Sequence, residues 1–92
     1  MNNVSIQTFE QAISATHDAA AKLSERVLVV ETFEGEEVWR GEVLVFQMRG
    51  HPTASYCYAW EVDGLVTTVL HIGPIDSPAR AVRASILAAA ED

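Results

Sequence analysis

Apolar residues recur every three or four positions from about residue 9 to residue 24, which is the spacing of one face of an α-helix. Phe9, Ile13 and Leu23 belong to this stripe. The segment TFEQ at positions 8–11 matches a capping box, in which the Thr8 hydroxyl accepts a hydrogen bond from the Gln11 N–H. The pattern therefore predicts a first helix over residues 9–24 with one face in the core.

The following residues change to the alternation and the β-branched content that are typical of strands. Glu34-Gly35 and Asp63-Gly64 are two-residue turn signals, and Asp63-Gly64 is the stronger hairpin signal. A loop around Gly50 and Pro52 separates the two hairpins. Four strands are predicted: Arg26–Phe33, Glu36–Met48, Ala54–Val62 and Leu65–Ile72.

A second helix is predicted from Pro78 to about Ala90. Ser77 is placed to cap its N-terminus, and Pro78 suits the first helical position because its missing N–H would have no partner there. Val82 and Ile86 mark its apolar face.

The length of 92 residues suits one domain, residues 1–92. Helix, four strands and helix with short strand connections favour an α+β fold, a two-layer sandwich in which a four-stranded antiparallel meander carries both helices on one face. The opposite face of the sheet would then be open.

The third predicted strand places Tyr56, Tyr58 and Trp60 on one face and the small residues Cys57 and Ala59 on the other. Small residues allow helices to approach closely, whereas Tyr and Trp tolerate a half-exposed surface. We therefore expect the aromatic row to face outward as a contact surface for a partner or a second subunit, the alternative being that it forms the core under the helices.

Thirteen acidic residues against six basic ones give a net charge of −7, which opposes direct binding to nucleic acids or to anionic lipid. Five glutamates lie within twelve residues around the first turn: Glu31, Glu34, Glu36, Glu37 and Glu42. This acidic hairpin either docks on a basic surface by mimicking a phosphate backbone, or forms a solvated edge that keeps the protein soluble. The candidate partner-binding residues are Glu31, Glu34, Glu36, Glu37, Tyr56, Tyr58 and Trp60.

Cys57, His51 and His71 are of the types that bind zinc or act as a catalytic pair, but their spacing matches neither use. The acidic residues cluster at a turn and not beside an evident pocket. We expect no enzyme activity, no metal and no cofactor. The single cysteine excludes an internal disulfide, and no segment is long and apolar enough to span a membrane, so a cytoplasmic location is expected.

Two family resemblances bear on function. The run from Leu70 to Val82 (LHIGPIDSPARAV) with the preceding WEVDG segment resembles HicB-type antitoxin domains, which have a partial RNase H-like fold and cover a small toxin. By size, acidity and lack of catalytic residues, the whole chain resembles the small anti-CRISPR inhibitors of phages and prophages, several of which occupy a crRNA-guided complex.

Two functional hypotheses follow. The first is a non-enzymatic binding module in which the acidic hairpin and the aromatic row engage a larger basic protein or ribonucleoprotein, as an anti-CRISPR-like inhibitor in the host cytoplasm would. The second is a homodimeric regulatory or antitoxin-like subunit that buries the aromatic row against itself.

Overall fold

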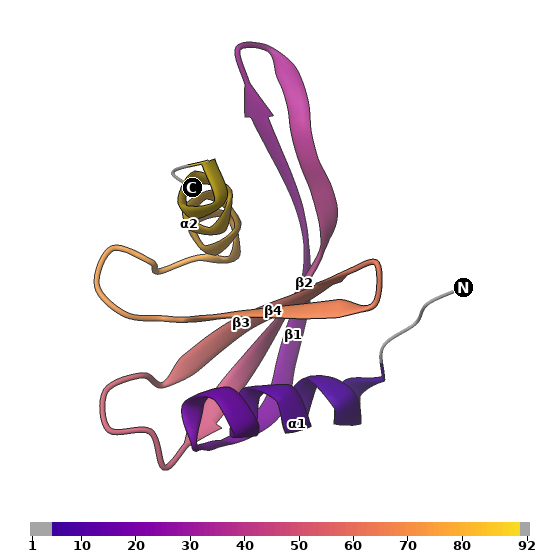
Figure 1. The fold of residues 1–92 in the computed structure, drawn as a ribbon. Coiled ribbons are helices and arrows are strands. Elements are labelled where there is room, and N and C mark those ends of the chain that lie inside the picture. The colour runs from indigo at the N-terminus through magenta and orange to yellow at the C-terminus, as the bar shows by residue number, and fades with distance from the viewer. Residues whose placement is uncertain (1–4, 91–92) are drawn as a thin grey trace.

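The computed structural model describes residues 5–90. In chain order it contains α1 (Ile6–His17), β1 (Ala20–Phe33), β2 (Glu36–Arg49), β3 (Tyr56–Val62), β4 (Leu65–Leu70) and α2 (Pro78–Ala90). The strands form one antiparallel sheet in the order β1-β2-β3-β4, so each strand pairs with its neighbour in sequence (Figure 1). The predicted α+β fold with a four-stranded meander is confirmed.

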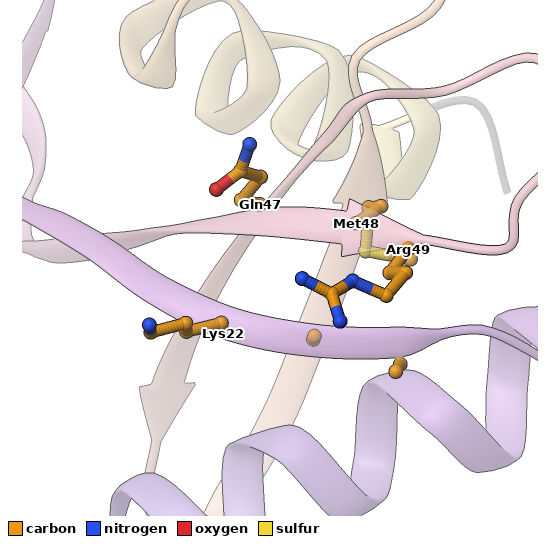
Figure 2. Close-up of a pocket in the computed structure, with 6 residues that line it drawn as sticks. Lys22, Gln47, Met48 and Arg49 are labelled. Atoms are coloured by element: carbon orange, nitrogen blue, oxygen red, sulfur yellow. The ribbon is translucent and has the colours of Figure 1, made fainter.

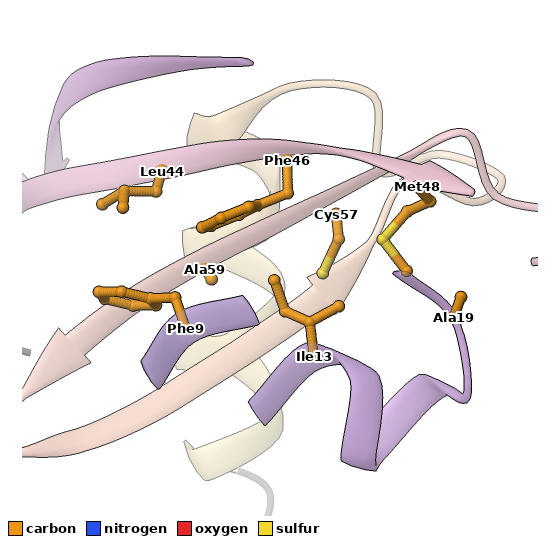
Figure 3. Packing of buried hydrophobic residues seen from close by; sticks show 8 residues of the cluster. All are labelled: Phe9, Ile13, Ala19, Leu44, Phe46, Met48, Cys57 and Ala59. Atoms are coloured by element: carbon orange, nitrogen blue, oxygen red, sulfur yellow. The ribbon is translucent and has the colours of Figure 1, made fainter. Parts of the chain in front are cut away.

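The two helices lie on opposite faces of this sheet (Figure 1). On one face, Phe9 and Ile13 of α1 pack against alternate residues of β2 and β3. Figure 2 shows the base of the β1–β2 hairpin at the end of this face, and Figure 3 shows the packed cluster itself. That cluster contains Phe9, Ile13, Ala19, Leu44, Phe46, Met48, Cys57 and Ala59. On the other face, Ala81 and Val82 of α2 pack against Val29, Val43, Val45, Tyr58 and Trp60.

The prediction that both helices cover one face is therefore wrong. The physical reason lies in the middle of β2, where four consecutive residues from Val43 to Phe46 are all buried. Successive side chains of a strand point to opposite faces, so this run makes both faces of the sheet apolar. One helix cannot cover both, and the result is three layers instead of two.

The first helix also differs from its predicted bounds. It begins three residues earlier, with Ser5 as N-cap, and ends at His17 because Asp18 adopts a left-handed conformation with φ 53°. Residues 20–24 belong to β1, where Lys22 pairs with Gln47 of β2 (Figure 2). Pairing with an available strand here outweighs the helix propensity of an alanine-rich segment.

The second helix and both turns agree with the sequence prediction. Ser77 caps α2, since its Oγ accepts a hydrogen bond from the Arg80 N–H at 3.2 Å, and Pro78 is the first helical residue. Both turns have positive φ at their two central residues, with 52° and 82° at Asp63 and Gly64. This is the type I′ geometry that matches the twist of a hairpin.

Candidate protein-interaction surface

The β1–β2 hairpin extends beyond the rest of the sheet (Figure 1). β2 pairs with β3 only from Leu44 to Gln47, whereas its pairing with β1 continues to Phe33 and Glu36 at the turn. Residues 27–43 therefore form a two-stranded ribbon. At about 3.4 Å per residue, the eight residue steps from Leu44 to Glu36 carry the tip about 27 Å from the last contact between β2 and β3.

One face of the ribbon is held by α2. Val29 and Val43 are buried against this helix, and the Glu31 carboxylate accepts a hydrogen bond from Nε of Arg83 at 2.8 Å. This hydrogen bond raises the pKa of Arg83. Glu31 is only 8% exposed, so the prediction that it belongs to an exposed acidic surface is wrong. It joins the ribbon to α2 instead.

The same face is closed further by two tryptophans. The rings of Trp39 and Trp60 meet edge to face, with centroids 6.0 Å apart. Gly41 makes this possible, because a Cβ at that position would lie 2.8 Å from the Trp39 ring. A glycine therefore lets the indole lie across its own strand and reach Trp60.

The opposite face of the ribbon is uncovered. Val29 faces α2, so the alternating neighbours Leu28 and Val30 point away from it, and they are 66% and 39% exposed. Among the described residues, α1 covers the base of the hairpin around Leu44 and Phe46 and does not reach this pair. The ribbon thus presents an exposed apolar pair, which we call the Leu28–Val30 patch.

Ion pairs flank this patch along the ribbon. Arg26 contacts Glu42 at 3.1 Å, and Arg40 contacts Glu37 at 2.8 Å. The hydrogen bond from Arg40 lowers the pKa of Glu37, so this carboxylate stays charged well below neutral pH. On the same face, Glu42 lies opposite Leu28 and Arg40 lies opposite Val30, so charged side chains border the patch along its β2 side.

The tip carries two carboxylates that have no basic partner among the described residues. Among residues 5–90, no ion pair involves Glu34 or Glu36. The large apolar residues Phe33 and Val38 next to them are 66% and 51% exposed. The predicted acidic cluster therefore divides into paired residues along the ribbon and unpaired ones at its tip.

A shallow hollow of about 490 Å³ lies where the ribbon meets the N-terminus of α1. Arg26 and Glu42 form its border with the ribbon, so it continues the uncovered face towards the core. Its other lining residues are Ser5, Ile6, Phe9, Leu44 and Glu61.

The aromatic row does not form the predicted outward surface. Tyr58 and Trp60 are 4% and 3% exposed because α2 covers their face of the sheet, and only Tyr56 keeps an exposed fraction of 38%. The prediction failed because it assumed that both helices pack on the face of the sheet that carries the small residues Cys57 and Ala59. The alternative interpretation, a core layer under a helix, is the one the structure shows for Tyr58 and Trp60.

The structure separates the three residues considered for metal or thiol chemistry. Cys57 faces α1 and is fully buried, and burial raises its pKa to about 12. His51 lies in the β2–β3 loop, where its Nδ1 accepts hydrogen bonds from the N–H groups of Thr53 and Ala54. His71 lies on the other side of the sheet, where its ring is hydrogen-bonded to the Tyr58 hydroxyl. The described part of the chain holds no group of three or more metal-ligating side chains.

The Tyr58–His71 pair is the core of a polar corner that the sequence did not reveal. The Tyr58 hydroxyl lies 2.6 Å from Nδ1 of His71, and the Tyr56 ring packs against the same imidazole with centroids 6.0 Å apart. Burial, and then the charges of Asp76 and Glu25, raise the pKa of Tyr58. The phenol therefore stays protonated at neutral pH and fixes the loop that leads to α2.

The Leu28–Val30 patch was also missed, although a signal for it was present. Val27 to Val30 are four apolar residues in succession, without the polar alternation that a half-exposed strand normally shows. In a strand at the edge of a sheet, such a run leaves apolar residues uncovered on one face.

No family model matches this chain, and neither the curated proteins nor the solved structures include a significant match to it. None of the helices within residues 5–90 is long and apolar enough to cross a membrane.

Proposed function

We propose that this protein is a non-enzymatic binding module whose ribbon docks on a basic surface of a larger protein or ribonucleoprotein. By occupying that surface, it would act as an inhibitor of a nucleic-acid-handling complex. The observation that carries the proposal is the projecting ribbon, with an uncovered apolar patch and unpaired carboxylates at its tip.

The negative charge of the ribbon supports the proposal that its partner is basic. Between positions 28 and 43 the ribbon has five glutamates and one arginine. At physiological ionic strength, charges act over about 8 Å, so a projecting acidic tip influences a partner mainly at close approach. Such complementarity contributes to association rate and specificity more than to affinity.

The apolar patch supplies part of the affinity. Full burial of a Leu or Val side chain stabilises by about 1.5–3 kcal/mol, so covering what remains exposed of Leu28 and Val30 would contribute about 2 kcal/mol. A micromolar complex requires about 8 kcal/mol. The partner must therefore also contact the charged flanks, the exposed tip and the hollow beside α1.

A crRNA-guided complex, the target that the resemblance to anti-CRISPR proteins implies, is one ribonucleoprotein with basic surfaces that hold nucleic acid. The antitoxin-like alternative needs an exposed aromatic row, and α2 covers two of the three residues of that row.

The test compares two variants of equal net charge. Glu34→Lys with Glu36→Lys reverses the tip without breaking an ion pair of the described residues. Gln7→Lys, Glu10→Lys and Gln11→Lys together make the same charge change on α1. Each variant and the wild type are immobilised, exposed to the same host lysate at moderate and high salt, and analysed by mass spectrometry. Retained proteins are then purified and assayed for release of their nucleic acid.

We expect the wild type and the α1 variant to retain a basic nucleic-acid-binding protein, which high salt releases. The tip variant should retain at least about tenfold less, while its melting temperature stays near that of the wild type. Addition of wild-type protein should displace nucleic acid from the purified partner. Equal retention by the tip variant would contradict docking through the ribbon.

A further inference from the structure

The outer edge of β1 is an unpaired sheet edge. β1 is the first strand in the sheet order, and it pairs with β2 along its other side over nearly its whole length of 14 residues. Among residues 5–90, no backbone hydrogen bond joins this edge to another segment. Its N–H and C=O groups are therefore available to a further strand.

The central part of this edge lacks the usual protection against strand pairing. Natural edge strands are kept short or carry charges, prolines or bulges. The pairing of β1 with β2 shifts register at Ser24 and again between Glu31 and Thr32. The extra residue at the second shift is Val38 of β2, so β1 itself runs without an inserted residue from Glu25 to Phe33. Its centre, Val27–Val30, has neither a charge nor a proline. The opposite edge strand, β4, has only six residues.

Charge along the hairpin indicates which strand would fit this edge. At the base, Lys22 and Arg49 lie on neighbouring strands, and no ion pair of the described residues uses either one (Figure 2). At the tip, Glu34 and Glu36 form no ion pair with any residue between positions 5 and 90. Two copies that run antiparallel would place Lys22 of each copy near the turn that carries Glu34 of the other.

We infer that the protein forms a twofold-symmetric dimer in which the outer edges of two β1 strands pair antiparallel. A pairing centred on Val29 uses the whole continuous stretch from Glu25 to Phe33. It places Leu28 beside Val30 of the second copy and Arg26 beside Thr32, and it puts no two like charges directly opposite each other. The interface is isologous, as a twofold axis requires.

This dimer goes beyond the proposed inhibitor function and does not depend on it. The new contact uses the backbone edge of β1, so the uncovered faces of the two ribbons remain open on the same side of a continuous sheet. The two Leu28–Val30 patches then adjoin and form one apolar surface across the twofold axis.

The test is a charge swap followed by analytical ultracentrifugation at low salt over a range of concentrations. One variant carries Lys22→Glu, and the other carries Glu34→Lys with Glu36→Lys. All three positions are exposed, so the fold should be retained, which circular dichroism checks. We expect a wild-type dimer and an increase of about tenfold in the dissociation constant of each variant, because every change acts at both ends of the interface.

A mixture of the two variants is the decisive sample. A mixed dimer contains one copy of each variant. At one of its ends, the acidic side chain introduced at position 22 of one copy lies near the tip of the other copy, which carries the basic side chains introduced at positions 34 and 36. The other end keeps the wild-type residues, so the affinity should return. A wild-type protein that remains monomeric at about 100 μM, a concentration that populates even weak interfaces, would overturn the inference. So would variants that dimerise equally well alone and mixed. Neither result would alter capture of a basic partner by the ribbon tip.

Discussion

At the scale of residues, the structure assigns different tasks to glutamates that look alike in the sequence. Glu31 is almost buried and joins the ribbon to Arg83, whereas Glu37 and Glu42 are exposed partners of Arg40 and Arg26. Sequence alone predicted the acidic cluster but not this division. The division depends on Arg83, which lies 52 positions from Glu31 in the chain, and on the helix that carries it.

Cys57 provides a test of the core at this scale. Burial raises its pKa from 9.0 to about 12, so the folded protein holds the thiol neutral while the unfolded chain ionises it near pH 9. The stabilising contribution is therefore complete below pH 9 and is lost as the pH rises from 9 towards about 12. This is the direction expected for an acidic group whose folded pKa is raised.

We expect Cys57→Ala to lower the free energy of unfolding at pH 7 by about 1 kcal/mol, because the smaller side chain leaves a cavity. The difference between variant and wild type should shrink above pH 9, since only the wild type has a thiol to ionise. Urea unfolding at neutral pH and at a pH between the two pKa values measures this. A difference that stays constant between the two conditions would contradict a thiol buried in the core.

At the scale of elements, the sequence predicted the order and type of every helix and strand, and local chemistry explains why. Asp63-Gly64 and Ser77-Pro78 are short motifs whose geometry depends on few other residues. The end of α1 was predicted less well, because residues 20–24 become a strand only through pairing with β2. The placement of α2 also depended on tertiary packing, although the four buried residues from Val43 to Phe46 indicated that both faces needed a cover.

The start of α1 gives a prediction at this scale. Oγ of Ser5 accepts a hydrogen bond from the Thr8 N–H at 3.1 Å, so Ser5 and not Thr8 caps the helix. Ser5→Ala should lower the free energy of unfolding by about 1 kcal/mol, the usual value for a lost N-cap. Thr8→Ala is the matched control and should cost less than half as much in the same urea titration. A larger loss for Thr8→Ala would place the cap at the originally predicted residue.

At the scale of the whole molecule, three layers leave the ribbon as the least covered part of the chain. α1 and α2 each close one face of the central sheet, but only α2 follows the hairpin outward. A two-stranded ribbon has little stability of its own, so contacts such as Glu31 with Arg83 and Trp39 with Trp60 hold it in place. The uncovered side then stays free for binding.

The most direct measurement of the central claim is backbone hydrogen exchange, followed by mass spectrometry, on the protein alone and with the partner retained in the capture experiment. Exchange reports the opening of individual segments. We predict that protection rises in peptides covering residues 25–43 and stays unchanged in α2. Increased protection in α1, β4 or α2 with an unchanged ribbon would contradict the account.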